Sequence, residues 1–411
     1  MKKNLQLIVY FIIFFMLLFG FQIRGINTRY LATALLFIEC VLIPSYRKQI
    51  GLLFKSPFKE VTKCVILFNV VTFLITFIHI KGDLSMFIGT IRIVICWFDC
   101  MMLWATLPCD KKQETFKLTS IAFIAQSFII FTAFLVPPFF EIVRQFQFDD
   151  IAENAARYLD HGTFRGLALA GDQFHGLTAA YGMAAIFVIK LYIDSKKTTW
   201  IVAFFVLFMA NMFVGRTGFA GFGLGLVYYL WESGKKAFSV GLKIIFVAVA
   251  LIFVLMQILP SDIKATINDS VFAYAFQLFY NYQDSGEMTT SSTDSVLEMW
   301  QEDISPITFL IGDGLCTNLD GSYYRHVDVG YLRQIFYGGV FYMLYAIYGV
   351  RNMLFSFAKR TKISKYKFEY LCLLYFLIVH AKGMDFMYAP EIMIMTMTYY
   401  LYLQSRQIIQ K

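Results

Sequence analysis

The densest group of side chains that could do chemistry lies between Tyr323 and Gly339. It combines arginines, a histidine, an aspartate and tyrosines, among them Arg325, His326, Asp328, Tyr331, Arg333 and Tyr337. A guanidinium group binds anions through parallel N–H donors, and an imidazole or carboxylate accepts a hydroxyl proton. Aromatic faces pack against sugar rings. The stretch therefore indicates a site for an anion and a sugar, although an aromatic belt at a helix start has a partly similar composition.

Other arginines and histidines stand in polar segments between apolar runs. Arg165 lies in one such segment, and Arg216 lies in a very tight turn, where a charge is costly without a partner. His175 follows Arg165 after ten residues. Imidazole is a candidate proton acceptor, while the simpler interpretation is that histidine prefers a membrane interface.

The elements that must position these residues are apolar runs long enough to cross a bilayer. About twelve (11–13) are predicted, at approximately 5–21, 28–44, 63–80, 86–107, 117–137, 174–193, 198–215, 217–231, 240–260, 329–350, 367–380 and 387–404. Glycines in the run at 217–231 would let neighbouring helices approach closely. The sequence thus predicts an all-α polytopic membrane protein, with 1–411 as a single membrane domain.

Positive charge gives the orientation of these spans. Threading the chain through them places almost every lysine cluster on one side, from Lys2 and Lys3 to Lys411. Short loops rich in Lys and Arg stay cytoplasmic, so both termini are predicted to be inside. Two large extracytoplasmic loops with short helices follow, at 138–173 and 261–328. The arginines named above then lie at the outer face, together with all five histidines.

Composition excludes the common soluble classes. The chain of 411 residues is 58% hydrophobic, 18% aromatic and 16% charged, whereas soluble domains approach about 25% charged residues. The net charge of +8 is spread over cytoplasmic segments and predicts no nucleic-acid partner. The cysteines have no metal-binding spacing, and no metal or other cofactor is expected. Arg92 and Asp99 share a face of one predicted span, about 10 Å apart, and are either functional or part of a structural network.

Three short motifs resemble a known family, the bacterial O-antigen and capsular polysaccharide polymerases (Wzy type) with the related O-antigen ligases. The turn Arg216-Thr217-Gly218 is similar to one between two spans of that family. The stretches from Gly312 and from Asp328 to Gly339 resemble its entry into the span after the large loop. Arg165 is followed by Gly176, with ten residues between them, which is the spacing described for these polymerases, whereas Arg325 has Phe336 at that offset.

The resemblance implies a metal-independent glycosyltransferase at the outer face of the bacterial plasma membrane. Its donor would be a glycan on undecaprenyl diphosphate and its acceptor a second lipid-linked repeat unit, for O-antigen, capsule or exopolysaccharide. On this basis His326 or Asp328 is the expected base. The expected diphosphate ligands are Arg165, Arg216 and Arg325, supported by Arg333, with His175 beside them. Tyr331 and Tyr337 are the expected sugar platforms.

Two alternatives remain open at this point. A ligase would move finished glycan onto another acceptor, and a flippase would carry lipid-linked sugars across the membrane. A transporter is expected to keep its charges near the midplane between two related halves, and no repeat is visible here. Expected partners are membrane lipids, a chain-length regulator and a flippase.

Overall fold

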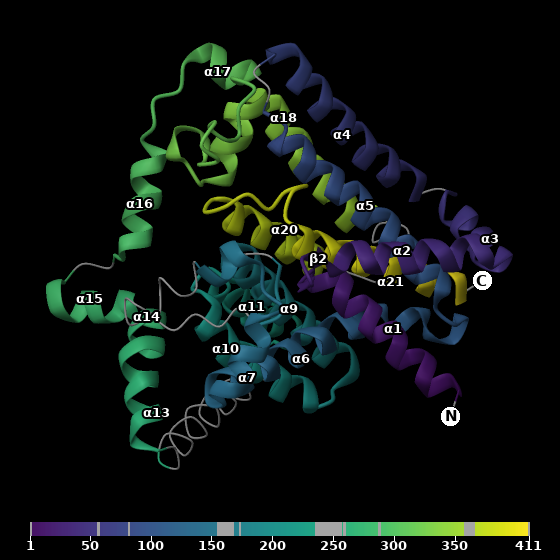
Figure 1. Ribbon diagram of the computed structural model, residues 1–411, viewed down its shortest axis with the longest axis horizontal. Helices are drawn as coiled ribbons and strands as arrows, with labels where there is room; N and C mark the ends of the chain where they lie inside the picture. Colours follow the sequence, from purple (N-terminus) through teal and green to yellow (C-terminus); the bar gives the residue numbers. More distant parts are fainter. Residues whose placement is uncertain are drawn as a thin grey trace. The chain divides into compact units, whose positions relative to one another are not determined.

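The computed structural model describes residues 2–55, 58–80, 83–153, 168–171, 174–234, 257, 260–286, 289–356 and 366–409. Helices dominate these residues, as Figure 1 shows, and confirm the all-α prediction at the level of class. The exception among them is a short antiparallel hairpin in which Gln22 pairs with Asn27. The chain forms two compact units, which we call unit 1 (1–18, 29–116 and 291–411) and unit 2 (19–28 and 117–290).

Unit 1 holds most of the N-terminal and C-terminal helices. They are α1 (Lys2–Phe19), α2 (Thr28–Leu42), α3 (Pro44–Leu53), α4 (Phe58–His79), α5 (Ser85–Thr106), η1 (Cys109–Glu114), α16 (Ser291–Trp300), α17 (Pro306–Ile311), η3 (Tyr324–His326), α18 (Gly330–Phe355), α20 (Lys367–His380) and α21 (Pro390–Ile409). Unit 2 holds β1 (Gln22–Ile23), β2 (Ile26–Asn27), α6 (Thr115–Leu135), α7 (Pro137–Arg144), α9 (Phe174–Ser195), α10 (Thr199–Val214), α11 (Phe219–Ser233), α13 (Ser261–Thr266), η2 (Ile267–Phe272), α14 (Ala273–Ala275) and α15 (Gln277–Ser285).

Several helices have the length and apolar character of membrane spans, which supports a membrane-embedded protein. Within the described residues, four qualify: Phe58–His79, Ser85–Thr106, Lys111–Leu135 and Phe174–Ser195. A fifth is added if α2 and α3, bent by 106°, form one broken span. The predicted span at 240–260 lies almost entirely outside the described residues. Other predicted spans coincide with helices that are shorter, bent or more polar.

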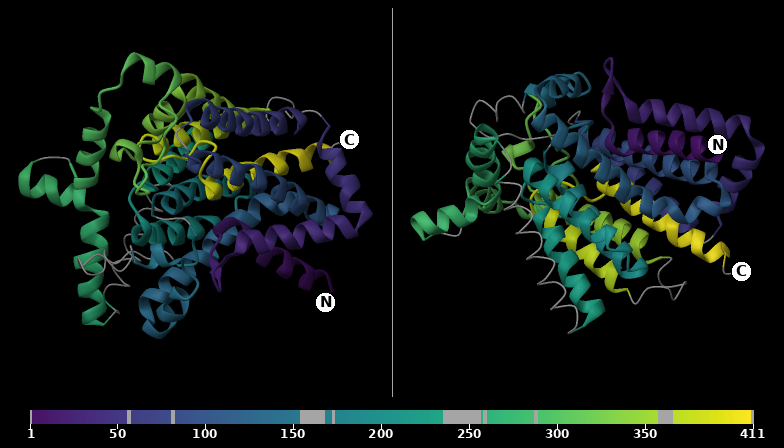
Figure 2. Two further views of the ribbon diagram at one scale, coloured as in Figure 1. Left: turned by 45° about the horizontal axis from the view of Figure 1, so that its top comes forward. Right: turned by 90° about the horizontal axis from the view of Figure 1, so that it is seen from below.

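The core of unit 1 is built on α5, which packs against α4 and α21. Figure 2 shows α5 and α21 running side by side. The indole of Trp97 stacks on Phe58 with ring centroids 4.7 Å apart and donates a hydrogen bond of 3.0 Å to Thr62. Trp104 of α5 donates to Ser405 of α21 at 2.7 Å. Burying large aromatic rings with a satisfied N–H fixes how these helices sit against one another.

A kink in α18 positions the residues before it. Gly339 breaks the helix with a φ of 76°, which is a conformation that suits glycine. Such a break frees carbonyl groups of the preceding turn, and two N–H groups satisfy them. Asp313 donates to the carbonyl of Phe336 at 2.5 Å, and Gly314 donates to that of Tyr337 at 3.1 Å. The turn after α17 is therefore attached to the kink, and α17 packs along α18.

Two glycines of unit 2 lie where helices pack closely, which confirms for them the prediction that glycines at 217–231 let neighbouring helices approach. A Cβ atom on Gly221 of α11 would lie 2.3 Å from the carbonyl oxygen of Gly182 in α9. A Cβ atom on Gly218 would lie 2.3 Å from the side-chain oxygen of Asn211. The hydroxyl of Thr178 donates to that same oxygen at 2.8 Å. Small residues thus let α9, α10 and α11 approach backbone to backbone.

Candidate functional site

The candidate site in unit 1 rests on a carboxylate that holds two distant segments together. Asp83, in the loop before α5, accepts hydrogen bonds from the backbone N–H groups of Cys316 at 2.5 Å and Thr317 at 2.8 Å. It also accepts from the Thr317 hydroxyl at 3.0 Å and from the N–H of Ser85 at 2.9 Å. Hydrogen bonds to a charged acceptor are about twice as strong as neutral ones. Asp83 therefore fixes the segment at Cys316 and Thr317 to the start of α5.

A hairpin-like turn over 317–323 follows this anchor. Thr317 and Tyr323 pair across it, and Asn318 donates its backbone N–H to the carbonyl of Ser322 at 2.8 Å. Asp320 accepts from the N–H and the hydroxyl of Ser322 at 2.9 and 2.6 Å. The turn is closed by its own short polar side chains, as is usual for Asp, Asn and Ser. This turn places the ring of Tyr323 over the guanidinium group of Arg333.

Arg333 lies beneath that ring and is the most informative residue of the site. Its side chain is buried, with the residue 5% exposed, and its guanidinium carbon lies 4.0 Å from the centroid of the Tyr323 ring. Nη2 donates to the sulfur of Cys316 at 3.1 Å, and the carboxylate of Asp328 stands 4.0 Å from Nη1. Nε has no hydrogen-bond partner within the described structure. A buried guanidinium normally satisfies its five donors, so this one has donors to spare for an anion.

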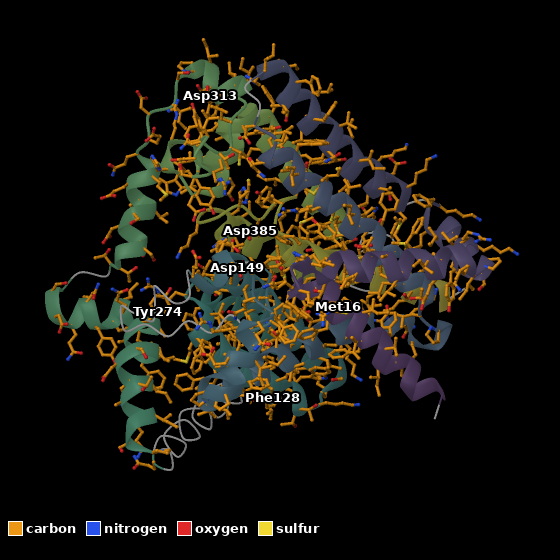
Figure 3. All side chains as sticks on the ribbon, viewed as in Figure 1. Met16, Phe128, Asp149, Tyr274, Asp313 and Asp385 are labelled. Atoms are coloured by element: carbon orange, nitrogen blue, oxygen red, sulfur yellow. The ribbon has the colours of Figure 1, made fainter. Side chains whose placement is uncertain are left out.

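Arg325 has the opposite surroundings. Its guanidinium pairs with Glu302 and Asp313, each at 3.4 Å, and donates to the carbonyl of Asp303 at 2.9 Å. It also lies 4.9 Å from the ring centroid of Phe336. Asp313, labelled in Figure 3, is the residue that follows the turn after α17. Two carboxylates already neutralise this charge, and we assign Arg325 a structural role in closing the loop.

The two expected bases lie on either side of this arrangement. His326 is exposed and, together with Gly321, Ser322 and Tyr323, lines an open cavity of about 390 Å³. Asp328 has a side chain 41% exposed, and it stands at ion-pair distance from Arg333. Both groups are accessible to a substrate hydroxyl. His326 faces the cavity, whereas Asp328 faces the cation.

The structure corrects one expected sugar platform and restricts another. Tyr337 is 0% exposed, and its hydroxyl donates to the carbonyl of Thr72 at 2.7 Å, so no ring face is left for a sugar. Its apolar ring and satisfied hydroxyl make it a core residue of α18. Tyr331 is half-buried and donates its hydroxyl to the carbonyl of Leu377 at 2.8 Å, with its ring against His380. Tyr323, for which no role was predicted, offers the exposed ring instead.

The remaining expected ligands belong to other parts of the chain. Arg165 lies outside the described residues. Arg216, in unit 2, donates to the side-chain oxygen of Gln277 at 2.5 Å and lies 4.5 Å from the ring centroid of Tyr274, which Figure 3 labels. His175 is half-buried in the first turn of α9.

Sequence reasoning missed Asp83 and Cys316 as members of the site. Their contact joins residues 233 positions apart, and Asp83 carries no local motif beyond a loop between two apolar runs. The sequence held a signal for Cys316, because it is the one cysteine within the two predicted outer loops. Within the described residues, no group of three or more His, Cys, Asp and Glu side chains has the arrangement to hold a metal ion.

We expect Asp83→Asn to lower the thermal stability of the purified protein at pH 7 and to flatten its acid dependence. Burial opposes ionisation of Asp83, yet the hydrogen bonds from Ser85, Cys316 and Thr317 outweigh it and lower its pKa. A lowered folded-state pKa gives stability that is present above the unfolded value, about 3.9, and lost as pH falls below it. The wild-type melting temperature should therefore approach that of the variant in acid.

The matched control is Asp284→Asn, on the exposed surface of α15. It should melt like the wild type at every pH. Parallel pH profiles of wild type and Asp83→Asn, measured between pH 7 and pH 3, would contradict the role of the Asp83 carboxylate.

Comparison of this chain with known proteins found no relative. Neither the sequence nor the fold matches any protein-family model, curated protein or solved structure.

Proposed function

We propose that this chain is a polymerase of repeat units linked to undecaprenyl diphosphate, working at the outer face of the bacterial plasma membrane. The observation that carries the proposal is the buried guanidinium of Arg333, which has a donor to spare. It lies beneath the ring of Tyr323, and Tyr323 lines an open cavity. An under-paired buried cation is costly, and an anionic substrate group would offset that cost. A leaving diphosphate is such a group.

The reaction requires stabilisation of the negative charge on the leaving diphosphate and removal of the proton from the acceptor hydroxyl. The acceptor hydroxyl oxygen forms a bond to the anomeric carbon of the donor sugar, and the bond from that carbon to the diphosphate oxygen breaks. Arg333 stabilises the negative charge that the leaving diphosphate gains, which preorganised donors do well in a site of low dielectric constant. The proton of the acceptor hydroxyl passes to His326, which lines the cavity, with Asp328 as the alternative base.

The proposal includes the membrane arrangement expected from the sequence. About twelve spans, cytoplasmic termini and two outer loops would place the cavity beside the outer leaflet. Arg165, Arg216 and His175 remain proposed substrate-binding residues. A chain-length regulator and a flippase remain the proposed partners in the cell.

Reconstitution of the purified chain in liposomes tests the function. The liposomes contain a defined undecaprenyl-diphosphate-linked repeat unit, and products are separated by size. We expect a ladder of lipid-linked oligomers without nucleotide sugar or added metal. Persistence of the single repeat unit under these conditions, with the protein folded and correctly inserted, would refute the proposal.

The same liposomes separate the two alternatives. A ligase would join glycan to a different acceptor and would leave chain length unchanged. A flippase would move the repeat unit between leaflets without extending it; the broken helix α18 is a feature that carriers also have. The size of the product and the leaflet in which it accumulates therefore distinguish all three.

A further inference from the structure

Arg92 is a cation in α5, a helix with the length and apolar character of a membrane span, and the described residues of unit 1 give it no counter-charge. It lies seven residues into α5, about 10 Å from the start of that helix. Its side chain is exposed, and it makes no hydrogen bond or ion pair within the described structure. An arginine at membrane depth costs roughly 2.5–3.5 kcal/mol on insertion scales, so such residues usually have a partner. A ligand can be that partner.

Tyr388 connects Arg92 with the site around Arg333. The ring of Tyr388 rests on α5 at Gly89, where an added Cβ atom would lie 2.1 Å from the ring. Gly89 is three residues before Arg92 and therefore on the same face of the helix, one turn away. The guanidinium groups of Arg92 and Arg333 both act electrostatically on the Tyr388 phenol. Arg92 in α5 and Arg333 in α18 therefore both lie near the phenol of Tyr388.

The contacts of Arg333 leave part of its hydrogen-bonding capacity available to an anion. The carboxylate nearest to Arg333 is Asp328, at 4.0 Å, and the hydrogen bond of Arg333 to Cys316 uses a weak sulfur acceptor. The Nε of Arg333 is buried without a hydrogen-bond partner in the described structure. Planar guanidinium groups bind phosphate oxygens in pairs, and a diphosphate has enough oxygens for two of them.

We propose that Arg92, Arg333 and Tyr388 form the diphosphate subsite, with Arg92 contacting the headgroup from within the bilayer. The inference rests on the proposed function in taking a polyprenyl diphosphate as the ligand. The depth of Arg92 explains why a lipid-linked diphosphate is suited to it: the phosphates reach the guanidinium groups while the polyprenyl chain stays among the lipid tails. A soluble anion would have no such reason to bind below the helix start.

Binding by the purified full-length chain in nanodiscs tests the subsite. The probes are farnesyl diphosphate, farnesol and inorganic pyrophosphate, in nanodiscs of phosphatidylcholine with or without phosphatidylglycerol. We expect farnesyl diphosphate to bind and Arg92→Gln to weaken it roughly 10- to 100-fold, which is the range for a charge-assisted hydrogen bond pair. Arg92→Lys should recover part of the affinity, because lysine keeps the charge without the planar fork.

Two further variants test the role of the Tyr388 hydroxyl and the specificity of the Arg92 effect. Tyr388→Phe retains the ring that packs on Gly89 and should weaken binding several-fold through loss of the hydroxyl group. Arg351→Gln, an exposed arginine near the other end of α18, is the matched control and should bind like the wild type. Unchanged affinity of folded Arg92→Gln would overturn the subsite. An equal effect of Arg92→Gln on phosphatidylglycerol binding would also overturn it, since Arg92 would then be an anchor for ordinary lipid.

Failure of the subsite and failure of the function give different results. If Arg92→Gln loses farnesyl diphosphate while wild type makes no polymer in liposomes, the subsite stands and the polymerase proposal falls. If wild type makes polymer and Arg92→Gln both binds and polymerises normally, the function stands and the subsite falls.

Discussion

Replacing Arg333 by methionine is expected to reduce polymer formation roughly 10²- to 10³-fold, the loss typical of removing one preorganised donor to a developing charge. The same substitution should leave the melting temperature of the ligand-free protein unchanged or raised. The reason is that Arg333 is buried with a weak sulfur partner and a carboxylate at 4.0 Å, so its charge contributes little to folding. Replacing an incompletely paired buried charge by an apolar side chain of similar length is often neutral or stabilising. Product length in liposomes and the melting temperature are measured on the same preparation.

Arg325→Met is the matched control for this prediction. Arg325 is paired with Glu302 and Asp313, so its loss leaves two carboxylates without their cation. We expect a lower melting temperature and a smaller direct effect on catalysis at a temperature where the variant is folded. Near-normal polymer formation by Arg333→Met, or a marked drop in its melting temperature, would show that Arg333 is a structural residue.

Gly339→Ala is expected to lower stability by about 2–5 kcal/mol, combining backbone strain with overpacking. Gly339 has a φ of 76°, and an added Cβ atom would lie 2.1 Å from the carbonyl oxygen of Leu310. The carbonyl oxygen of Leu310 belongs to the backbone and cannot swing away as a flexible side chain could, so α17 must move away from α18. The hydrogen bonds from Asp313 and Gly314 to the kink would be lost with that movement. Denaturation in detergent measures the effect, and polymer formation should fall in parallel.

Gly223→Ala provides the contrast, because nothing lies within 4 Å of a Cβ atom at this position in α11. Alanine is favoured over glycine inside a helix by about 0.5–1 kcal/mol, so this variant should be neutral or slightly more stable. A Gly339→Ala protein that melts with the wild type would mean that α17 does not dock on the kink as described.

The sequence by itself determined the class of the protein and the place of its densest chemistry. Long apolar runs encode helices because every buried backbone group must find a partner within its own segment. The glycines of the run at 217–231 predicted close helix packing, which is found at Gly221, because a missing side chain lets two backbones meet. The region from Tyr323 to Gly339 was found from composition alone. The orientation and the number of spans remain predictions.

Only the tertiary structure decided which of these residues share an environment. Arg325 and Arg333 are eight positions apart and look equivalent in the sequence, yet one is paired with two carboxylates and the other has spare donors. Tyr337 looked available and is enclosed, because the kinked helix turns its ring towards Thr72. Enclosure depends on residues hundreds of positions away, as the bond from Tyr337 to Thr72 and the link from Asp83 to Thr317 illustrate. Periodicity and composition record local preferences, whereas charge pairing depends on how the loop folds and burial arises when distant helices meet.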